Sequence, residues 1–411
     1  MEALKFGNGV WATKTGSSMA YNDQSGNYKP LPFNVVRNSI ATRVNKEGLI
    51  EVVGKDKLRI DYTDTDKGVA LLENSATNSL VQSNQFDTTW SANNATLTSG
   101  QIGVGGSTDA WKLESNSNTS ETYIRQTASL SGTSSLTIYA KKGNSNFLGV
   151  YIGSSGADIS TYFDLNNGVV GNTSNTIETK IKSVGNDWYR CTVVGSNINQ
   201  NVNFYVTDAN SNFLSNNGSY IYIQYSQLES GSIASSYIPT SGSAVTRAAD
   251  VASGSGNSKV FSDTQGVLYA NIANSETSNG SYIGISNGTT NQRLILGNEF
   301  GLLQVYSNGI NIDGNVKSAN KDFNKIAIKY TSSNASIYFN GFLLKSKNAS
   351  YNLSGINQLI FSAGSTTFAR FHGKTKELGY YDAILTDSEL EKLTSYNSLS
   401  ELVTELNLNT L

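Results

Sequence analysis

Short runs of alternating apolar and polar residues, rich in Val, Ile, Tyr and Phe, recur from about residue 76 to residue 385. Residues 136–140, 220–225 and 325–330 are examples, and clusters of Gly, Asn, Asp and Ser lie between such runs. This period-two pattern predicts β-strands joined by turns. Because no segment with helical spacing separates these runs, we expect the strands to pair antiparallel. The sequence therefore predicts an all-β protein of two consecutive antiparallel β-sandwiches of the jelly-roll type.

The two ends of the chain depart from this pattern. Residues 1–75 are rich in turns and alternate weakly, although residues 45–54 have the pattern of a hairpin that turns near Gly48. Segments without a clear apolar face need a partner, so we expect an irregular N-terminal arm for attachment or oligomerisation. A small cap folded on the next domain is the alternative. At the other end, Thr386 and Glu389 fit a capping box, which predicts a helix before a short helical tail.

These patterns divide the chain into four parts. We expect an N-terminal attachment region at 1–75, a first sandwich at 76–250, a second sandwich at 251–395 and a helical tail at 396–411. The stretch around residues 227–250 ends one run of strands and precedes the next, so it is interpreted as the seam between the two sandwiches.

Composition limits the functions that the chain can have. Only 15% of its 411 residues are charged and the net charge is −2, so we expect no nucleic acid partner and no basic membrane-binding surface. Cys191 is the single cysteine, which excludes a disulfide within one chain. No apolar stretch approaches the length of a membrane span. The N-terminus lacks the basic and apolar regions of a secretion signal, so we expect synthesis in a cytoplasm.

Groups that could catalyse a reaction are scarce. His372 is the single histidine, and because it precedes a strand-like run we expect a structural role for it. Asp61, Asp64 and Asp66 could gather oxygens around Ca²⁺, but their spacing lacks the terminal bidentate Glu of a helix-loop-helix calcium site, so a solvated turn is favoured. We therefore expect no catalytic residue, no metal and no cofactor. Paired carboxylates for glycoside cleavage are a spatial arrangement that a sequence does not exclude.

Carbohydrate binding requires less chemistry than catalysis. A ring presents a flat surface to the apolar face of a sugar, and Asn, Asp or Gln side chains bind its hydroxyls. Strand alternation places about half of such rings in a core, so a core role is the alternative for each candidate. The candidate carbohydrate-binding residues are Tyr151, Tyr162, Tyr205, Tyr282 and Tyr306.

Several motifs together carry a resemblance to a known class of proteins. The motifs are residues 84–86 with Trp90, 139–143, 163–168, 184–191, and a seam formed by 227–232, 236–240 and 246–250. With these residues the middle domain resembles the carbohydrate-binding-like module of tailed-phage head and tail fibre proteins. Residues 6–9, 43–51 and 59–62 resemble the openings of such proteins. The last domain, with residues 385–390, is similar to concanavalin A-like, laminin G-type lectin domains. Residues 72–80 depart from the family pattern, which usually has a Pro and consecutive leucines there.

The resemblance implies a non-enzymatic virion protein, present on the particle surface as a head fibre, tail fibre or capsid decoration. It implies adhesion to host or environmental glycans through many weak lectin-like sites on one particle. It also implies attachment to other virion proteins through residues 1–75 and assembly as a homotrimer. Two alternatives remain open, namely a structural decoration or tail component that binds no glycan, and a polysaccharide depolymerase.

Overall fold

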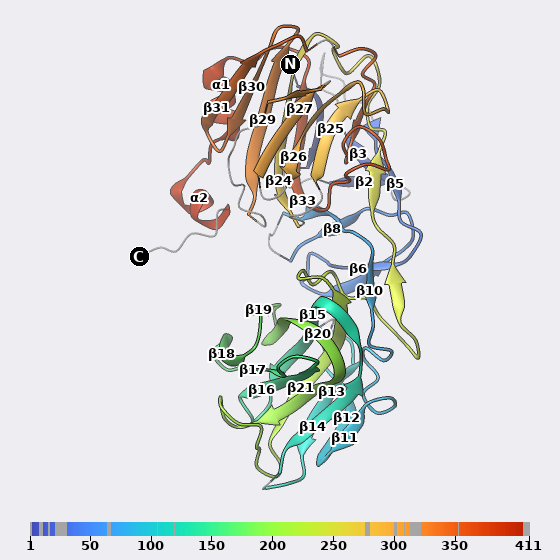
Figure 1. The fold of residues 1–411 in the computed structure, drawn as a ribbon, viewed down its shortest axis with the longest axis vertical. Coiled ribbons are helices and arrows are strands. Elements are labelled where there is room, and N and C mark those ends of the chain that lie inside the picture. The colour runs from blue at the N-terminus through green and yellow to red at the C-terminus, as the bar shows by residue number, and fades with distance from the viewer. Residues whose placement is uncertain are drawn as a thin grey trace. The chain divides into compact units, whose positions relative to one another are not determined.

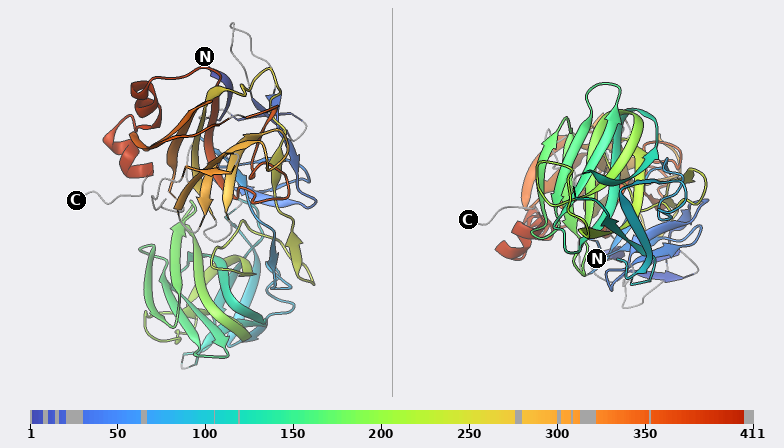
Figure 2. Two further views of the ribbon diagram at one scale, coloured as in Figure 1. Left: turned by 45° about the horizontal axis from the view of Figure 1, so that its top comes forward. Right: turned by 90° about the horizontal axis from the view of Figure 1, so that it is seen from below.

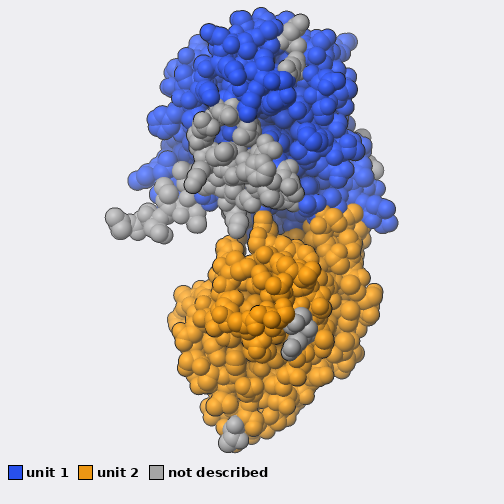
Figure 3. Space-filling view, viewed as in Figure 1, with its two compact units in different colours: residues 1–38, 54–74, 249–411 blue, residues 39–53, 75–248 orange. Residues whose placement is uncertain are grey.

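The chain forms two compact units, which Figure 3 shows in different colours. Unit 1 consists of residues 1–38, 54–74 and 249–411, and unit 2 consists of residues 39–53 and 75–248. The structure is a computed structural model that describes residues 2–7, 11–14, 17–20, 31–63, 67–104, 106–118, 120–275, 280–299, 302–307, 309–312, 322–351 and 353–405. Strands dominate both units and all their pairings in extended ladders are antiparallel, so the predicted all-β sandwich class is confirmed.

Unit 1 contains two large sheets. The first has eight strands, in the order β31 (Phe342–Asn348), β30 (Asn334–Phe339), β29 (Asn324–Thr331), β24 (Gln265–Asn274), β33 (Gly373–Tyr381), β9 (Val69–Leu72) and β8 (Arg59–Asp61), with β1 (Glu2–Gly7) also paired to β33. The second has five, in the order β28 (Ile310–Asn311), β27 (Leu302–Ser307), β26 (Arg293–Glu299), β25 (Ser281–Ser286) and β32 (Gln358–Ile360). Inward side chains of both sheets, such as Leu268, Ile328, Ile285 and Leu296, share one apolar core.

Short ladders complete unit 1. They are β2 (Ala12–Lys14), β3 (Ser17–Ala20) and β4 (Leu31–Pro32), and the pair β5 (Asn34–Val36) with β23 (Val251–Ser253). Phe33, which lies between β4 and β5, is buried and its ring is 4.3 Å from that of Phe6 and 4.9 Å from that of Phe361. The N-terminal residues therefore contribute aromatic side chains to the core of the last sandwich.

The first 75 residues differ from the predicted irregular arm in how they pack. Strands β1, β8 and β9 are members of the eight-stranded sheet, and Leu4, Phe6, Ile60 and Leu72 are buried in its core. Strand β9 is buried along its whole length, and a strand covered on both faces has a continuous apolar sequence without alternation. For this reason the alternating pattern did not predict that these residues form strands of the sheet. The attachment role predicted for residues 1–75 is a separate question and stays a prediction.

Two short helices, α1 (Asp387–Thr394) and α2 (Leu399–Glu405), follow the last strand. The predicted capping box of α1 is present, because the Thr386 hydroxyl accepts from the Glu389 amide while the Glu389 carboxylate accepts from the Thr386 amide. Leu390 of α1 is buried against the outer face of the eight-stranded sheet, in contact with a cluster that includes Tyr269 and Tyr338. Among the described residues, neither helix nor any other has the length and apolar character that a membrane span requires.

The strands of unit 2 between residues 91 and 230, coloured from light blue through green to yellow-green in Figures 1 and 2, form a jelly-roll-like sandwich. One layer contains β12 (Ala95–Gln101), β13 (Ala110–Ser115), β21 (Tyr220–Ser230), β15 (Leu130–Lys142) and β19 (Glu178–Ser183). The other contains β11 (Ser91–Asn93), β14 (Thr122–Thr127), β16 (Phe147–Ser154), β17 (Ile159–Asp164) and β18 (Val169–Ser174). The long strand β20 (Trp188–Thr207) belongs to both layers, since residues 188–198 pair with β15 and residues 198–207 pair with β16.

Two tight turns have the backbone conformation that their residues favour. Asn340 and Gly341 connect β30 to β31 with φ values of 48° and 95°, the conformation that a two-residue hairpin turn requires. Strands β6 (Ala41–Val44) and β7 (Ile50–Val53) form the predicted hairpin of unit 2, and Gly48 has a φ of 80° in its turn.

The seam that follows β21 is held against unit 2 by buried polar side chains. The Gln227 side-chain oxygen accepts from the Ile238 amide (2.5 Å), and the Glu229 carboxylate accepts from the amide and hydroxyl of Ser235 (2.9 and 2.5 Å). The Thr240 hydroxyl donates to the Leu80 carbonyl (2.6 Å). Strands β10 (Ala76–Asn78) and β22 (Val245–Arg247) then pair at the end of the unit. Gln227, Glu229 and Thr240 therefore hold in place the long connection between β21 and β22.

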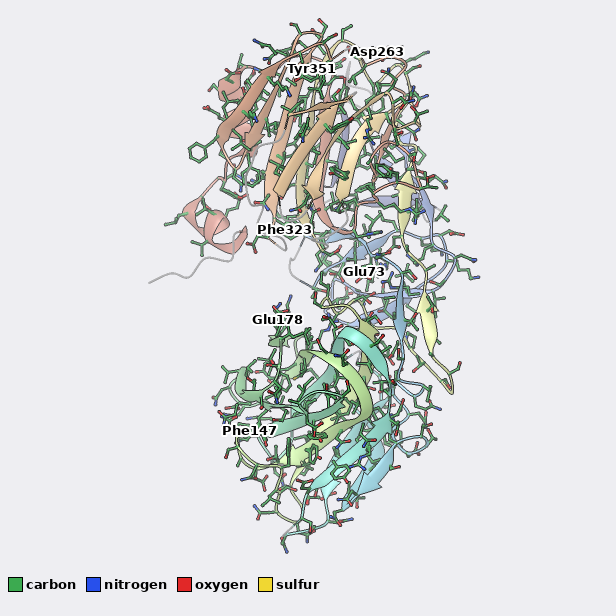
Figure 4. All side chains as sticks on the ribbon, viewed as in Figure 1. Glu73, Phe147, Glu178, Asp263, Phe323 and Tyr351 are labelled. Carbon is green, nitrogen blue, oxygen red and sulfur yellow. The ribbon has the colours of Figure 1, made fainter. Side chains whose placement is uncertain are left out.

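Buried charges surround the place in unit 1 where the chain returns from unit 2. The Asp250 carboxylate accepts from Arg37 Nη1 at 2.8 Å and from Arg59 Nη2, and both arginine side chains are 0% exposed. Arg59 also pairs with Glu73 (2.7 Å), which is labelled in Figure 4, and the Glu73 amide donates to Asp250 (2.9 Å). Burial alone lowers the pKa of Arg59, but the carboxylates of Glu73 and Asp250 outweigh it and raise the pKa above its ordinary value. We call these four side chains the Asp250 network.

Candidate functional site

Four neighbouring strands of unit 2 turn tyrosines away from the core. Ile124, Val150, Phe163 and Phe204 point inward from β14, β16, β17 and β20, so the residues next to them point to the opposite face. Register places these outward residues in two rows across the strands. The first row is Tyr123, Tyr205, Gly149 and Tyr162, and the second is Arg125, Asn203, Tyr151 and Ser160. We call these two rows, with Phe213, the tyrosine face.

Phe213 covers the centre of the tyrosine face. It lies in the connection between β20 and β21, and its ring stacks on those of Tyr205 (4.2 Å between centroids) and Tyr162 (4.9 Å). Gly149 makes room for it, because a Cβ at that position would come within 2.9 Å of two Phe213 ring carbons. Under this cover Tyr162 and Tyr205 are only 6% and 4% exposed, and burial raises the pKa of both phenols. These two tyrosines therefore form the floor of the face.

Tyr151 lies at the border of this floor and is half-buried. Its ring is edge-on to Phe213 at 6.4 Å, and its hydroxyl donates to the Asp158 carboxylate at 2.5 Å. Asp158 also accepts from the Ser154 amide (3.2 Å). These hydrogen bonds, first from Tyr151 and then from Ser154, lower the pKa of Asp158, so its carboxyl group is ionised at neutral pH. Tyr151 thus offers a ring edge beside a fixed carboxylate.

A polar chain completes the face on the side of β14. Arg125 Nε donates to Asn203 Oδ1 (3.1 Å), and Asn203 Nδ2 donates to the Tyr205 hydroxyl (3.1 Å). The Arg125 guanidinium also lies over the Tyr123 ring at 4.8 Å and donates to its hydroxyl (3.0 Å). Half-buried rings, a guanidinium and a carboxylate are the types of group that bind sugar rings and their hydroxyls.

The Tyr151–Asp158 hydrogen bond predicts a measurable titration. The bond, then burial, raises the pKa of Tyr151 to about 12. Since the raised pKa belongs to the folded state, its stabilising effect is present below the ordinary value of 10.0 and is lost as the pH rises through about 12. We expect Asp158→Asn to return the pKa of Tyr151 toward its ordinary value in a tyrosine-selective NMR titration, with the signal assigned by Tyr151→Phe. Asp187→Asn, in a distant turn, should leave it unchanged. A pKa of Tyr151 at its ordinary value in the unmodified protein would contradict the hydrogen bond between Tyr151 and Asp158.

The five predicted tyrosines do not form one site. Tyr151, Tyr162 and Tyr205 meet on the tyrosine face, whereas Tyr282 and Tyr306 lie in unit 1, on the outer face of its five-stranded sheet. Tyr282 is 7% exposed and packs with Ile295. Tyr306 is half-buried, and the Arg293 guanidinium lies 4.8 Å from its ring. Tyr162, Tyr205 and Tyr282 are as buried as residues of a core, which was the alternative to a binding role. Tyr162 and Tyr205 nevertheless lie beneath Phe213 on the tyrosine face.

The structure describes one of the three calcium candidates. Asp61 is buried, accepts from the Thr63 amide (3.2 Å) and lies 3.3 Å from the Lys374 ammonium. Asp64 and Asp66 lie outside the described residues. Within the described ranges, no three His, Cys, Asp or Glu side chains come together in a way that could hold a metal ion. Cys191 is buried in the core of unit 2, and burial raises the pKa of its thiol well above the ordinary value.

Sequence reasoning missed five members of the site, namely Tyr123, Arg125, Asp158, Asn203 and Phe213. Arg125 and Asn203 were not considered because an alternating strand does not show which polar residues lie beside a ring on the next strand. Phe213 lies in a connection, outside the strand pattern. One signal could have found it, since Phe213 and Leu214 are the only large apolar residues in an Asn- and Ser-rich stretch from 208 to 219.

No family model matches the chain, and no curated protein matches its sequence. Similar solved structures include carbohydrate-binding modules and laminin G-type domains.

Three of these structures illustrate the range. The sialidase module CBM40 of Ruminococcus gnavus, bound to α2,3-sialyllactose, is 15% identical with a TM-score of 0.30, over 35% of this chain and 94% of that one. Domain 4 of the arabinanase AbnA from Geobacillus stearothermophilus, with arabinotriose, is 15% identical with a TM-score of 0.31, over 36% and 73%. Domains LG4-5 of the mouse laminin α1 chain are 8% identical with a TM-score of 0.24, over 74% and 88%. At these values the likeness does not indicate what this chain binds.

Proposed function

We propose that the chain is a non-enzymatic adhesion protein of a tailed-phage particle, and that unit 2 binds host or environmental glycans on the tyrosine face. The observation that carries the proposal is the cluster of half-buried rings, Tyr123, Tyr151 and Phe213, beside the polar groups of Arg125 and Asp158. Rings of this kind bind the apolar face of a sugar, and the polar groups fix its orientation.

The placement on a virion rests on the resemblance of the seam and of the domain order to phage fibre proteins. Attachment to other virion proteins through residues 1–75 and assembly as a homotrimer belong to the same proposal. Val36, Ile40 and Val52 of that region are 46%, 48% and 61% exposed, and the proposed attachment would cover such side chains. Many copies on one particle would multiply weak single-site binding.

A binding role fits the tyrosine face better than glycoside cleavage. A glycosidase needs one carboxyl group that is protonated at working pH, together with a second carboxylate. Hydrogen bonds lower the pKa of Asp158, so this carboxyl group does not hold a proton at neutral pH. Incubating the full chain with host capsule or exopolysaccharide tests the depolymerase alternative directly, because new reducing ends would show cleavage.

Replacing Tyr151 by alanine should weaken glycan binding about tenfold or more, since a ring contact and its hydroxyl are lost together. The full chain and the variant would be compared on a glycan array and then by titration with the best ligand. Tyr222→Ala is the matched control, because Tyr222 is also half-buried in unit 2 but lies in β21. An equal loss of affinity in both variants would contradict binding at the tyrosine face. If the full chain binds neither glycans nor host cells, the alternative of a structural component that binds no glycan is favoured.

A further inference from the structure

Arg125 is held in one orientation on the tyrosine face by neutral partners. Its Nε donates to Asn203, its Nη2 donates to the Tyr123 hydroxyl, and its plane lies over the Tyr123 ring. Asn203 is itself buried and fixed by its hydrogen bond to Tyr205. The guanidinium is therefore pre-organised, and its Nη1 donors and one Nη2 donor are not used by these contacts.

The positive charge of Arg125 has no carboxylate beside it among the described residues. Glu121, which precedes it by four residues on the same face of the strand, has its backbone about 13 Å away at the rise of an extended strand. Asp158 accepts from Tyr151, at the far side of the face beside β17. A half-buried guanidinium without a counter-charge favours a planar anion that can accept two of its donors.

We propose that Arg125 makes the tyrosine face selective for glycans that carry a carboxylate, such as uronic acids. The inference rests on the proposed glycan-binding function and names its ligand class. The sugar carboxylate would accept from the free edge of the guanidinium, while the ring lies against Tyr151 and Phe213. The Asp158 carboxylate, which accepts from Tyr151, lies beside β17 at the other end of the face. An acidic sugar is therefore oriented with its charge at the Arg125 end.

The test uses pairs of ligands that differ only in this charge. Oligomers of glucuronic, galacturonic and mannuronic acid are titrated against the full chain, each beside its carboxyl-reduced neutral counterpart of the same linkage. We expect at least one acidic oligomer to bind about tenfold tighter than its neutral partner, because a charge-assisted hydrogen bond adds that much. Added salt should weaken the acidic ligand alone.

Variants assign the preference to one residue. Arg125→Gln should abolish the difference within a pair, and an unchanged thermal unfolding transition of the variant would show that unit 2 is still folded. Arg125→Lys, which keeps the charge and loses the planar fork, should keep part of the difference. Lys180→Gln removes a positive charge from β19, outside the face, and should change nothing. Equal binding of acidic and neutral partners, or a preference that survives Arg125→Gln, overturns this inference and leaves the proposed function standing. If the full chain binds no member of any pair and no glycan on the array, both this inference and the proposed function are overturned.

Discussion

Asp250→Asn is expected to lower the free energy of unfolding of unit 1 by about 3–5 kcal/mol, the range for breaking one partner of a buried ion pair. The substitution keeps the volume of the side chain but removes the charge that Arg37 and Arg59 share. Both guanidinium groups are inaccessible to solvent and cannot recover hydration where they lie. Hydrogen exchange measured in denaturant on peptides from β24 and β33 would report the stability of unit 1 separately from that of unit 2.

The control for this variant is a surface ion pair. Asp187→Asn removes a carboxylate of unit 2 that is 3.6 Å from Lys141 and largely exposed, so we expect the free energy of unfolding of unit 2 to change by no more than about 0.5 kcal/mol. If Asp250→Asn destabilised unit 1 no more than Asp187→Asn destabilises unit 2, the Asp250 network would not hold unit 1 together as its geometry indicates.

Removing residues 1–75 is expected to unfold unit 1. The deletion takes β1, β8 and β9 out of the eight-stranded sheet and removes Leu4, Phe6, Ile60 and Leu72 from the core. Burial of each such side chain contributes about 1.5–3 kcal/mol, and a whole domain is stable by only about 5–15 kcal/mol. The residues of β24, β29 and β33 should therefore exchange their amide hydrogens freely in a chain that begins at residue 76.

A deletion at the other end serves as the comparison. Removing residues 397–411 takes away α2 and its ion pair between Glu401 and Lys325, but none of the described residues that form the main core of unit 1. We expect unit 1 to keep its protected amides in that chain. Cooperative unfolding of unit 1 in the chain that starts at residue 76 would show that β1, β8 and β9 are dispensable.

Local features were predictable from sequence because neighbouring residues determine them. The strands around residues 136–140 and 220–225 lie within β15 and β21, and the Asn340–Gly341 turn has the backbone that its residues favour. The Thr386–Glu389 capping box is present for the same reason. Alternation named Tyr151, Tyr162 and Tyr205 as candidates, but it did not say which rings leave the core or which strands are neighbours.

Features that depend on distant contacts were not predictable in this way. The depth of Tyr162 and Tyr205 is set by Phe213, a residue of a connection that alternation does not describe. The Asp250 carboxylate accepts hydrogen bonds from Arg37 and Arg59, which precede it in the chain by 213 and 191 residues. Strand β9 has no polar face, so its membership of the sheet became visible only through its pairing with β33.

The interrupted sequence of unit 1 determines the order in which the protein can mature on the ribosome. Glu2 of β1 pairs with Tyr381 of β33, so the first strand emerges long before the partner that completes its sheet. Unit 2, formed by residues 39–53 and 75–248, is fully synthesised while unit 1 still lacks most of its strands. The nascent chain therefore carries the apolar residues of β1, β8 and β9 without their final partner, a stage at which chaperone binding would protect them from aggregation.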